Sequence, residues 1–229
     1  MHGNGFLAIW SDVQPAQETD YLHWLTREHT TERVSIPGFL AVRVFRALTT
    51  DVRRFFILYE LEEPEVMASA DYLSRLNSPT PWSQRIMPIL GNFARGGGRC
   101  TASKGIGQGG FVAPILLRGA AATEAFDALD NVITMDRIAA VRLLETDNSR
   151  TSIRTTEKQL RQTDSTFEGL VLIEGLDENA VQSAIHRVFR DNKDLPRPNE
   201  VTLYVHFFGL HQADISAPGL LRVETRPFP

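Results

Sequence analysis

The chain has 229 residues, 42% of them apolar and 23% charged, which is typical of a folded globular protein rather than a disordered one. The formal charge of −4, from 24 basic and 28 acidic residues, predicts no broad cationic surface and argues against a nucleic-acid partner. A single cysteine, Cys100, excludes an intrachain disulfide and fits a cytoplasmic location, and no apolar run approaches the roughly 18 residues that span a membrane.

The first part of the chain predicts a strand, a helix, two strands, a second helix and a last strand. The apolar runs alternate with turn signals, and Pro37-Gly38 predicts the tight turn into the second strand. The last strand contains Gly96-Gly97-Gly98, so we expect it to be short or irregular. The expected strands cover residues 5–10, 38–45, 54–60 and 89–100, and the helices cover residues 18–34 and a segment that begins at 64–66.

The second part of the chain repeats this order. Glu60 and Glu174 close the matching third strands, and the polar stretch between residues 144 and 167 contains a possible short helix at 156–161. The expected strands cover residues 110–116, 138–144, 167–174 and 201–208, and the expected helices cover 123–135 and a segment that begins at 179–181.

This repeat predicts an α+β fold of two tandem ferredoxin-like βαββαβ units. Because each unit leaves one apolar sheet face uncovered, we expect the two antiparallel sheets to form one pseudo-dimeric α+β barrel. The predicted divisions are a first half at residues 1–102, a Gly-rich linker at 103–110, a second half at 111–212 and an extended C-terminal arm at 213–229.

The first half contains, in this order, Trp24, Glu28-His29, Glu32-Arg33, Ile36-Pro37-Gly38-Phe39, Tyr59-Glu60-Leu61, Tyr72 and Pro79-Thr80-Pro81-Trp82-Ser83. Through these residues it resembles the EthD-like branch of the dimeric α+β barrel superfamily over about residues 6–100. The resemblance implies a cavity between sheet and helices, lined by a histidine from the first helix region and by aromatic residues from the strands. It also implies a monomer or a homodimer, since members usually dimerise whereas a duplicated chain can close the barrel alone.

His29 is the candidate catalytic residue. It follows Leu22 and Leu25 at helical spacing on the apolar face, and a neutral imidazole can accept a proton near physiological pH. The alternative is a structural histidine with a hydrogen-bond partner. Glu28 points about 100° away around the helix, so we expect Glu28 or Glu32 to pair with an arginine such as Arg27, Arg33 or Arg43.

Aromatic side chains supply the candidate substrate-binding residues, although each can equally fill the core. Strand alternation can direct Tyr59 and Trp10 into the barrel. His206 shares a strand face with Tyr204 and Phe208, and periodicity leaves open whether that face lines the cavity. The full set is Trp10, Trp24, Tyr59, Tyr72, Trp82, Tyr204 and His206.

These residues favour a metal-free acid/base enzyme, a lyase, isomerase or cyclase, that acts on a small apolar metabolite with an aromatic ring or a carbonyl group. Two alternatives stay open: a small-molecule-binding or stress-associated protein of the same fold, and a cofactor-free or haem-linked oxygenase. We expect no cofactor, because the Gly-rich segments lack the lysine and the serine or threonine of a phosphate loop. We expect no metal, because metal-ligand spacings are missing.

Overall fold

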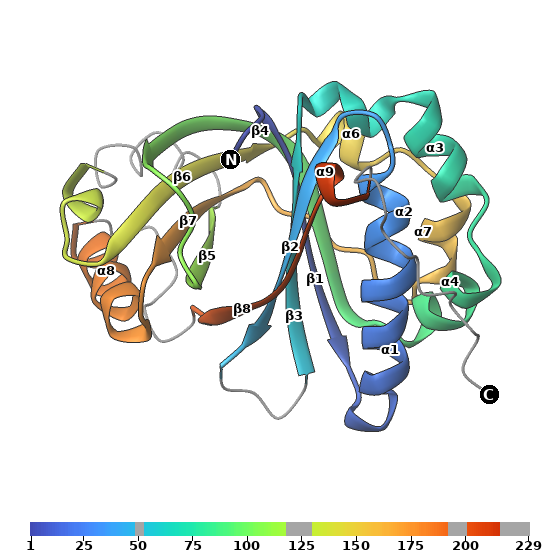
Figure 1. The fold of residues 1–229 in the computed structure, drawn as a ribbon, viewed down its shortest axis with the longest axis horizontal. Helices are drawn as coiled ribbons and strands as arrows, with labels where there is room; N and C mark the ends of the chain where they lie inside the picture. Colours follow the sequence, from blue (N-terminus) through green and yellow to red (C-terminus); the bar gives the residue numbers. More distant parts are fainter. Residues whose placement is uncertain (49–52, 118–129, 192–200, 216–229) are drawn as a thin grey trace.

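Eight antiparallel strands close into a barrel in the computed structural model, which describes residues 1–48, 53–117, 130–191 and 201–215 (Figure 1). The strand order around the barrel is β1-β3-β2-β8-β5-β7-β6-β4. The strands are β1 (Gly5–Val13), β2 (Phe39–Ala47), β3 (Arg53–Leu61), β4 (Gly91–Gly105), β5 (Phe111–Leu117), β6 (Ile138–Thr146), β7 (Gly169–Gly175) and β8 (Tyr204–His211).

The barrel consists of two sheets with the same internal order. The first sheet runs β4-β1-β3-β2 and the second runs β8-β5-β7-β6, which is the ferredoxin-like order in each half. Pairing of β2 with β8 and of β4 with β6 joins the sheets at both edges. The α+β class and the closed barrel are therefore confirmed.

β4 is not short, although the expected irregularity is present as a register shift in its pairing with each neighbour. It is fifteen residues long, pairs with β1 through residues 91–99 and with β6 through residues 98–105. A Cβ on Gly98 would lie 2.0 Å from the backbone oxygen of Glu145, so the glycine allows β4 and β6 to approach closely. Residues 103–105 of the predicted linker belong to this strand, and only residues 106–110 connect it to β5.

The first predicted helix is continuous but contains three parts. α1 (Glu18–Trp24) leads into a π-helical turn (Leu25–His29) and then α2 (Thr30–Val34). The Pro37-Gly38 turn is confirmed, because Gly38 has a φ of 87° at the start of β2. The other α-helices are α3 (Ala70–Asn77), α4 (Pro81–Ile86), α6 (Asn148–Thr151), α7 (Thr156–Leu160), α8 (Glu178–Asp191) and α9 (Gln212–Ile215), and short 3₁₀ turns occupy Pro15–Gln17, Pro64–Ala68 and Met87–Ile89.

Two predicted segments lie partly outside the described residues. Of the helix expected at 123–135, residues 118–129 are outside the described part and residues 130–133 are helical. Of the expected C-terminal arm, residues 216–229 are outside it, whereas 213–215 belong to helix α9 instead of an extended segment. Within the described ranges, the helices are all too short or too polar to cross a membrane.

The core has three layers. One apolar cluster lies between the outer face of the first sheet and helices α1–α4, and a second lies between the outer face of the second sheet and α8 (Figure 1). The third fills the barrel interior with side chains such as Phe6, Phe45, Phe56 and Leu172. Both faces of each sheet are thus apolar, and the barrel interior is a packed core.

Four buried charges lie among the strands and join the two halves. Arg43 on β2 donates two hydrogen bonds, of 2.6 and 3.1 Å, to the Glu174 carboxylate on β7, and Arg142 on β6 also pairs with Glu174. Glu60 on β3 lies 3.9 Å from Arg43. Burial opposes ionisation of Glu174, but its arginine partners outweigh that effect and lower the pKa of Glu174.

The connection between β6 and β7 crosses to the other half of the molecule. It contains α6 and α7, and α7 lies beside α3 and α4 on the first-half side of the barrel (Figure 1). The Oγ1 of Thr151 accepts a hydrogen bond of 3.2 Å from the Gly97 amide of β4. The short helix expected at residues 156–161 is therefore present, and its position brings second-half residues to a first-half surface.

Candidate functional site

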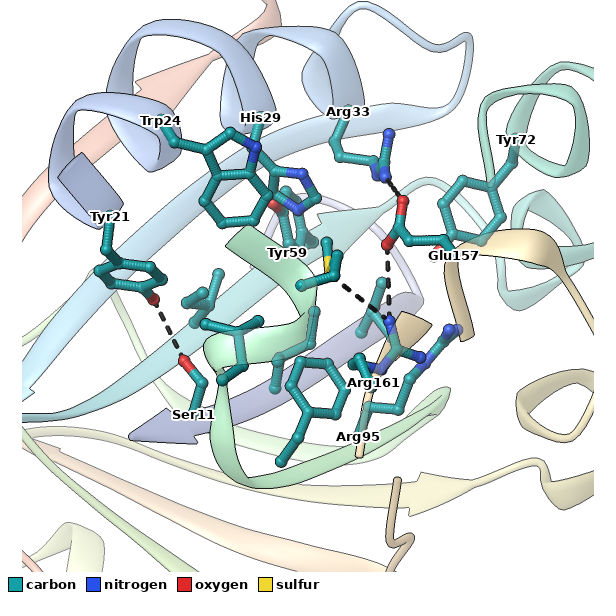
Figure 2. A pocket seen from close by; sticks show the side chains of 16 residues that line it. Ser11, Tyr21, Trp24, His29, Arg33, Tyr59, Tyr72, Arg95, Glu157 and Arg161 are labelled. Carbon is teal, nitrogen blue, oxygen red and sulfur yellow. Dashed lines mark hydrogen bonds and ion pairs between the residues drawn. The ribbon is translucent and has the colours of Figure 1, made fainter. Parts of the chain in front are cut away.

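A small cavity lies between the outer face of the first sheet and the surrounding helices, with α7 at one side (Figure 2). Its volume open to a water-sized sphere is about 20 Å³, which is room for one water molecule. Its lining is apolar toward the sheet and strongly polar toward α2 and α7. The lining residues are Leu7, Ile9, Ser11, Tyr21, Trp24, His29, Arg33, Ile57, Tyr59, Tyr72, Met87, Leu90, Phe93, Arg95, Glu157 and Arg161.

The π-helical turn positions His29. The Thr30 amide donates to the Leu25 carbonyl five residues earlier, so this turn holds one residue more than an α-helical turn. The His29 ring packs on Trp24 with 4.2 Å between ring centroids, and the Trp24 indole N–H donates a 3.1 Å hydrogen bond to Ser83 Oγ. Trp24 thereby fixes the orientation of the imidazole.

His29 is a neutral imidazole in the folded protein. Its side chain is only 5% exposed, and its buried Nδ1 has no hydrogen-bond partner in the described part of the chain. Burial lowers the pKa of His29 well below its ordinary value, and the positive charges of Arg33 and Arg161 lower it further. A buried polar atom without a partner is rare in native proteins, and here it borders the cavity.

Two tyrosines face the same cavity. The Tyr59 hydroxyl is buried without a hydrogen-bond partner among the described residues, whereas Tyr21 shares a 3.1 Å hydrogen bond with Ser11 Oγ. Burial raises the pKa of both phenols, so both stay protonated. The Tyr59 hydroxyl is therefore a hydrogen-bond donor available to a cavity occupant.

Three arginines surround the polar end of the cavity (Figure 2). Arg33 pairs with Glu157, and Arg161 lies 3.6 Å from Glu157 and 3.0 Å from Asp164. Burial opposes the charge on Arg33, but Glu157 and Glu32 outweigh it and raise the pKa of Arg33. Arg95 is 5% exposed, and its guanidinium has no hydrogen bond or ion pair within the described ranges.

Four of the predicted site residues meet at this cavity: His29, Trp24, Tyr59 and Tyr72. Tyr59 faces the helices, contrary to the expectation that it points into the barrel. Trp10 and Tyr204 do point into the barrel, where Trp10 packs on Phe56 and Phe167, so they lie on the other side of the sheet from His29. Trp82 is outside the lining and donates a 2.9 Å hydrogen bond to Asp20.

His206 is exposed on β8 and makes an edge contact with Phe45. The predicted shared face holds for Tyr204 and His206, which lie opposite Ala47 and Phe45, but it is wrong for Phe208, because the β2–β8 register shifts between Val44 and Phe45. This bulge sends Phe208 to the helix-side core while Tyr204 stays in the barrel interior.

The carboxylates near His29 follow the expected pattern in part. Glu32 pairs with Arg33 at 3.0 Å, as predicted. Glu28 instead accepts a 2.6 Å hydrogen bond from Thr80, and Arg43 pairs with Glu174. Neither carboxylate forms a dyad with His29.

Sequence reasoning missed Arg95, Glu157 and Arg161. Arg95 precedes the glycine run that predicted an irregular strand. Had that segment been read as a regular strand, Phe93 and Arg95 would have shared a face. No local sequence pattern identifies Glu157 or Arg161 as site residues, because only the long connection after β6 brings them to the cavity.

No protein-family model and no curated protein matches this sequence. Solved structures do match its shape. The chain has an α+β barrel fold. An anthrone oxidase-like protein has a TM-score of 0.58 at 12% identity, with 96% of this chain and 98% of that chain covered.

Two further structures have similar scores. A putative monooxygenase from Lactobacillus acidophilus NCFM has a TM-score of 0.53 at 10% identity, covering 91% of this chain and 97% of that one. Chlorite dismutase from Candidatus Nitrospira defluvii, in complex with imidazole, has a TM-score of 0.51 at 10% identity, covering 94% of each chain. Such low identities show a shared fold and leave the EthD-like branch a prediction.

A haem does not fit the cavity beside His29. Pockets for drug-sized ligands measure roughly 300–1,000 Å³, whereas this cavity has about 20 Å³. Trp24 also covers a face of the imidazole at 4.2 Å. Within the described ranges, no three His, Cys, Asp or Glu side chains gather as metal ligands do.

Proposed function

We propose that this protein is an enzyme in which His29 removes a proton from a small aromatic or carbonyl-bearing compound bound at the cavity. The observation that supports this role is the buried Nδ1 of His29, which borders the cavity and has no hydrogen-bond partner among the residues that the structure describes. Because the imidazole is neutral, it is already in the form that accepts a proton. The reaction is then a lyase, isomerase or cyclase step that begins with a carbanion, enolate or phenolate.

The surrounding charges suit such a step. A base with a lowered pKa abstracts a proton only if the resulting anion is stabilised. The cavity supplies the Tyr59 hydroxyl and the guanidinium group of Arg161 for that purpose. These donors lie in a water-poor site, where electrostatic stabilisation of a developing charge is strongest.

Access requires movement of the lining. About 20 Å³ holds one water, so an aromatic ligand enters only when side chains move apart. Glu157 belongs to the five-residue helix α7 and Arg161 directly follows it, and the unbranched Met87 side chain lies 3.8 Å from Arg161 Nη1. We expect displacement of α7 to open the cavity, since it lies within the long connection between β6 and β7.

A cofactor-free oxygenase is the second candidate. It shares the first step, because a deprotonated aromatic substrate is electron-rich enough to react with molecular oxygen. Its support is that one fold neighbour is an anthrone oxidase-like protein and another is a putative monooxygenase. Oxygen consumption during turnover separates the two candidates.

The test is a screen of aromatic acids, phenols and lactones for turnover, followed by His29→Ala and His29→Gln. We expect each variant to lose a factor of roughly 10²–10⁴ in rate, the usual contribution of general acid–base catalysis. His186→Gln, on the exposed side of α8, is the matched control and should retain full rate. Full activity in His29→Gln would exclude His29 as the base.

A further inference from the structure

Arg95 is a buried cation without a counter-ion in the described part of the chain. It lies on β4 opposite Ile9 of β1, on the face that borders the cavity, and its side chain is 5% exposed. Its Nε is buried without a hydrogen-bond partner. An isolated buried charge costs several kcal/mol by order of magnitude, and buried charges in native proteins are normally paired.

The neighbouring carboxylates are already occupied. Glu157 lies between Arg33 and Arg161, Asp164 accepts a 3.0 Å hydrogen bond from Arg161, and Glu32 pairs with Arg33. Each of the other two arginines therefore has acidic partners. At this end of the cavity, Arg95 is the arginine without an acidic partner among the described residues.

The excess positive charge also affects nearby groups. Burial lowers the pKa of Lys158, and the charge of Arg95 lowers it further. Burial likewise lowers the pKa of Arg161, and Arg95 contributes to that decrease. Both effects indicate that this part of the protein would be stabilised by one more negative charge.

We infer that Arg95 is the recognition residue for a carboxylate group carried by the ligand. This inference rests on the proposed function insofar as it takes the cavity to be the ligand site. A planar guanidinium can bind both carboxylate oxygens through two parallel hydrogen bonds. The ligand class is therefore a small aromatic or unsaturated monocarboxylate, with its hydrocarbon part against Leu7, Ile9 and Ile57.

A permanent carboxylate explains the arrangement better than an anion formed only during reaction. Arg95 has no partner among the described residues of the resting protein, so the unfavourable burial exists before any chemistry begins. A ligand that arrives with its own negative charge removes that penalty on binding. The same charge opposes the effect of Arg33 and Arg161 on His29 and makes the imidazole a stronger base when the ligand is bound.

The experiment measures binding of benzoate and of its neutral analogue benzamide by isothermal titration calorimetry. We expect wild type to bind benzoate at least about tenfold more tightly than benzamide, since a hydrogen bond to a charged group is worth that factor or more. Arg95→Gln should remove the preference, and Arg95→Lys should keep part of it. Arg99→Gln, an exposed arginine on the same strand, is the matched control and should keep all of it.

Thermal melting without ligand gives a second readout. Because Arg95 has no counter-ion in the described ranges, the Tm of Arg95→Gln should equal or exceed that of wild type, whereas removal of a structural arginine would lower the Tm. Equal affinity for benzoate and benzamide, absence of benzoate binding, a preference that persists in Arg95→Gln, or a lower Tm in that variant would each overturn the inference.

The outcomes separate this inference from the proposed function. Benzoate binding by His29→Gln is expected to keep its charge preference, because Arg95 is intact. If turnover survives in His29→Gln while the preference depends on Arg95, the acid/base role is wrong and the carboxylate site stands. If turnover needs His29 but Arg95→Gln keeps the preference, only the carboxylate inference is wrong.

Discussion

The neutral state of His29 predicts a pH dependence of stability. Its pKa in the folded protein lies well below the ordinary value of 6.5, which it regains on unfolding. The unfolded chain therefore binds one more proton below pH 6.5, and protonation favours unfolding. The stability that neutral His29 contributes is fully present above about pH 6.5, and it decreases as the pH falls toward the pKa of His29 in the folded protein.

One proton corresponds to about 1.4 kcal/mol of unfolding free energy per pH unit. For each protein we compare the unfolding free energy at pH 5.5, one unit below the ordinary pKa, with its own value at pH 7.5. Wild type should lose about 1.4 kcal/mol more than His29→Gln over this range. For a chain of this size that difference corresponds to roughly 3–6 °C in Tm. Glutamine keeps hydrogen-bonding capacity but does not titrate.

The assay is chemical denaturation of both proteins at pH 7.5, 6.5 and 5.5. Other groups with lowered pKa values, such as Glu174, Asp147 and Asp177, also lose stability in acid, but they are present in both proteins and cancel in the comparison. Parallel loss of stability in wild type and His29→Gln would refute the argument that His29 is buried and neutral.

Two further predictions concern the fold. Gly38→Val should lower the unfolding free energy by about 1–3 kcal/mol, because Gly38 has a φ of 87° and an added Cβ would lie 2.5 Å from Val66 Cγ2. Thermal melting measures this loss, and an unchanged Tm would contradict the role of the turn. Glu174→Leu should cost about 3–5 kcal/mol, because it leaves Arg43 and Arg142 buried without their shared carboxylate. Denaturant titration would show it, and a loss below 1 kcal/mol would mean that other groups compensate both charges.

The strand order was accessible to sequence reasoning because each half repeats the same signals. Three strands of each half can be located and matched from the alternating apolar runs, from Pro37-Gly38 and from the matching positions of Glu60 and Glu174. β4 was misjudged because Gly96-Gly97-Gly98 resembles a break when only local propensity is considered. In the fold, Gly98 serves the close approach of β6, a tertiary requirement that overrides propensity.

The candidate site was predictable only where local spacing determines it. Helical periodicity placed His29 with Leu25 on the inward face, although the π-helical turn that sets its final orientation has no local signature. Arg95 and Glu157 come from segments sixty-two residues apart in sequence, and only the paired strands and the crossing connection bring both to the cavity. Face assignments on β8 failed for a related reason, since a bulge in its pairing with β2 is invisible in the sequence of β8 alone.

The two sides of the barrel are unequal, and only one of them carries the candidate site. The core beneath α8 consists of aliphatic side chains such as Val141, Val171, Ile173 and Ile185, and it includes no charged residue among those described. The first-half side instead gathers a histidine, three arginines and a glutamate around one cavity. Arg33 depends on Glu157 from the other half to neutralise its charge, so the first half alone would leave it with Glu32 as its remaining close acidic partner. A site assembled in this way requires both halves in one closed barrel, which gives the joined sheets a functional reason beyond the covering of apolar surface.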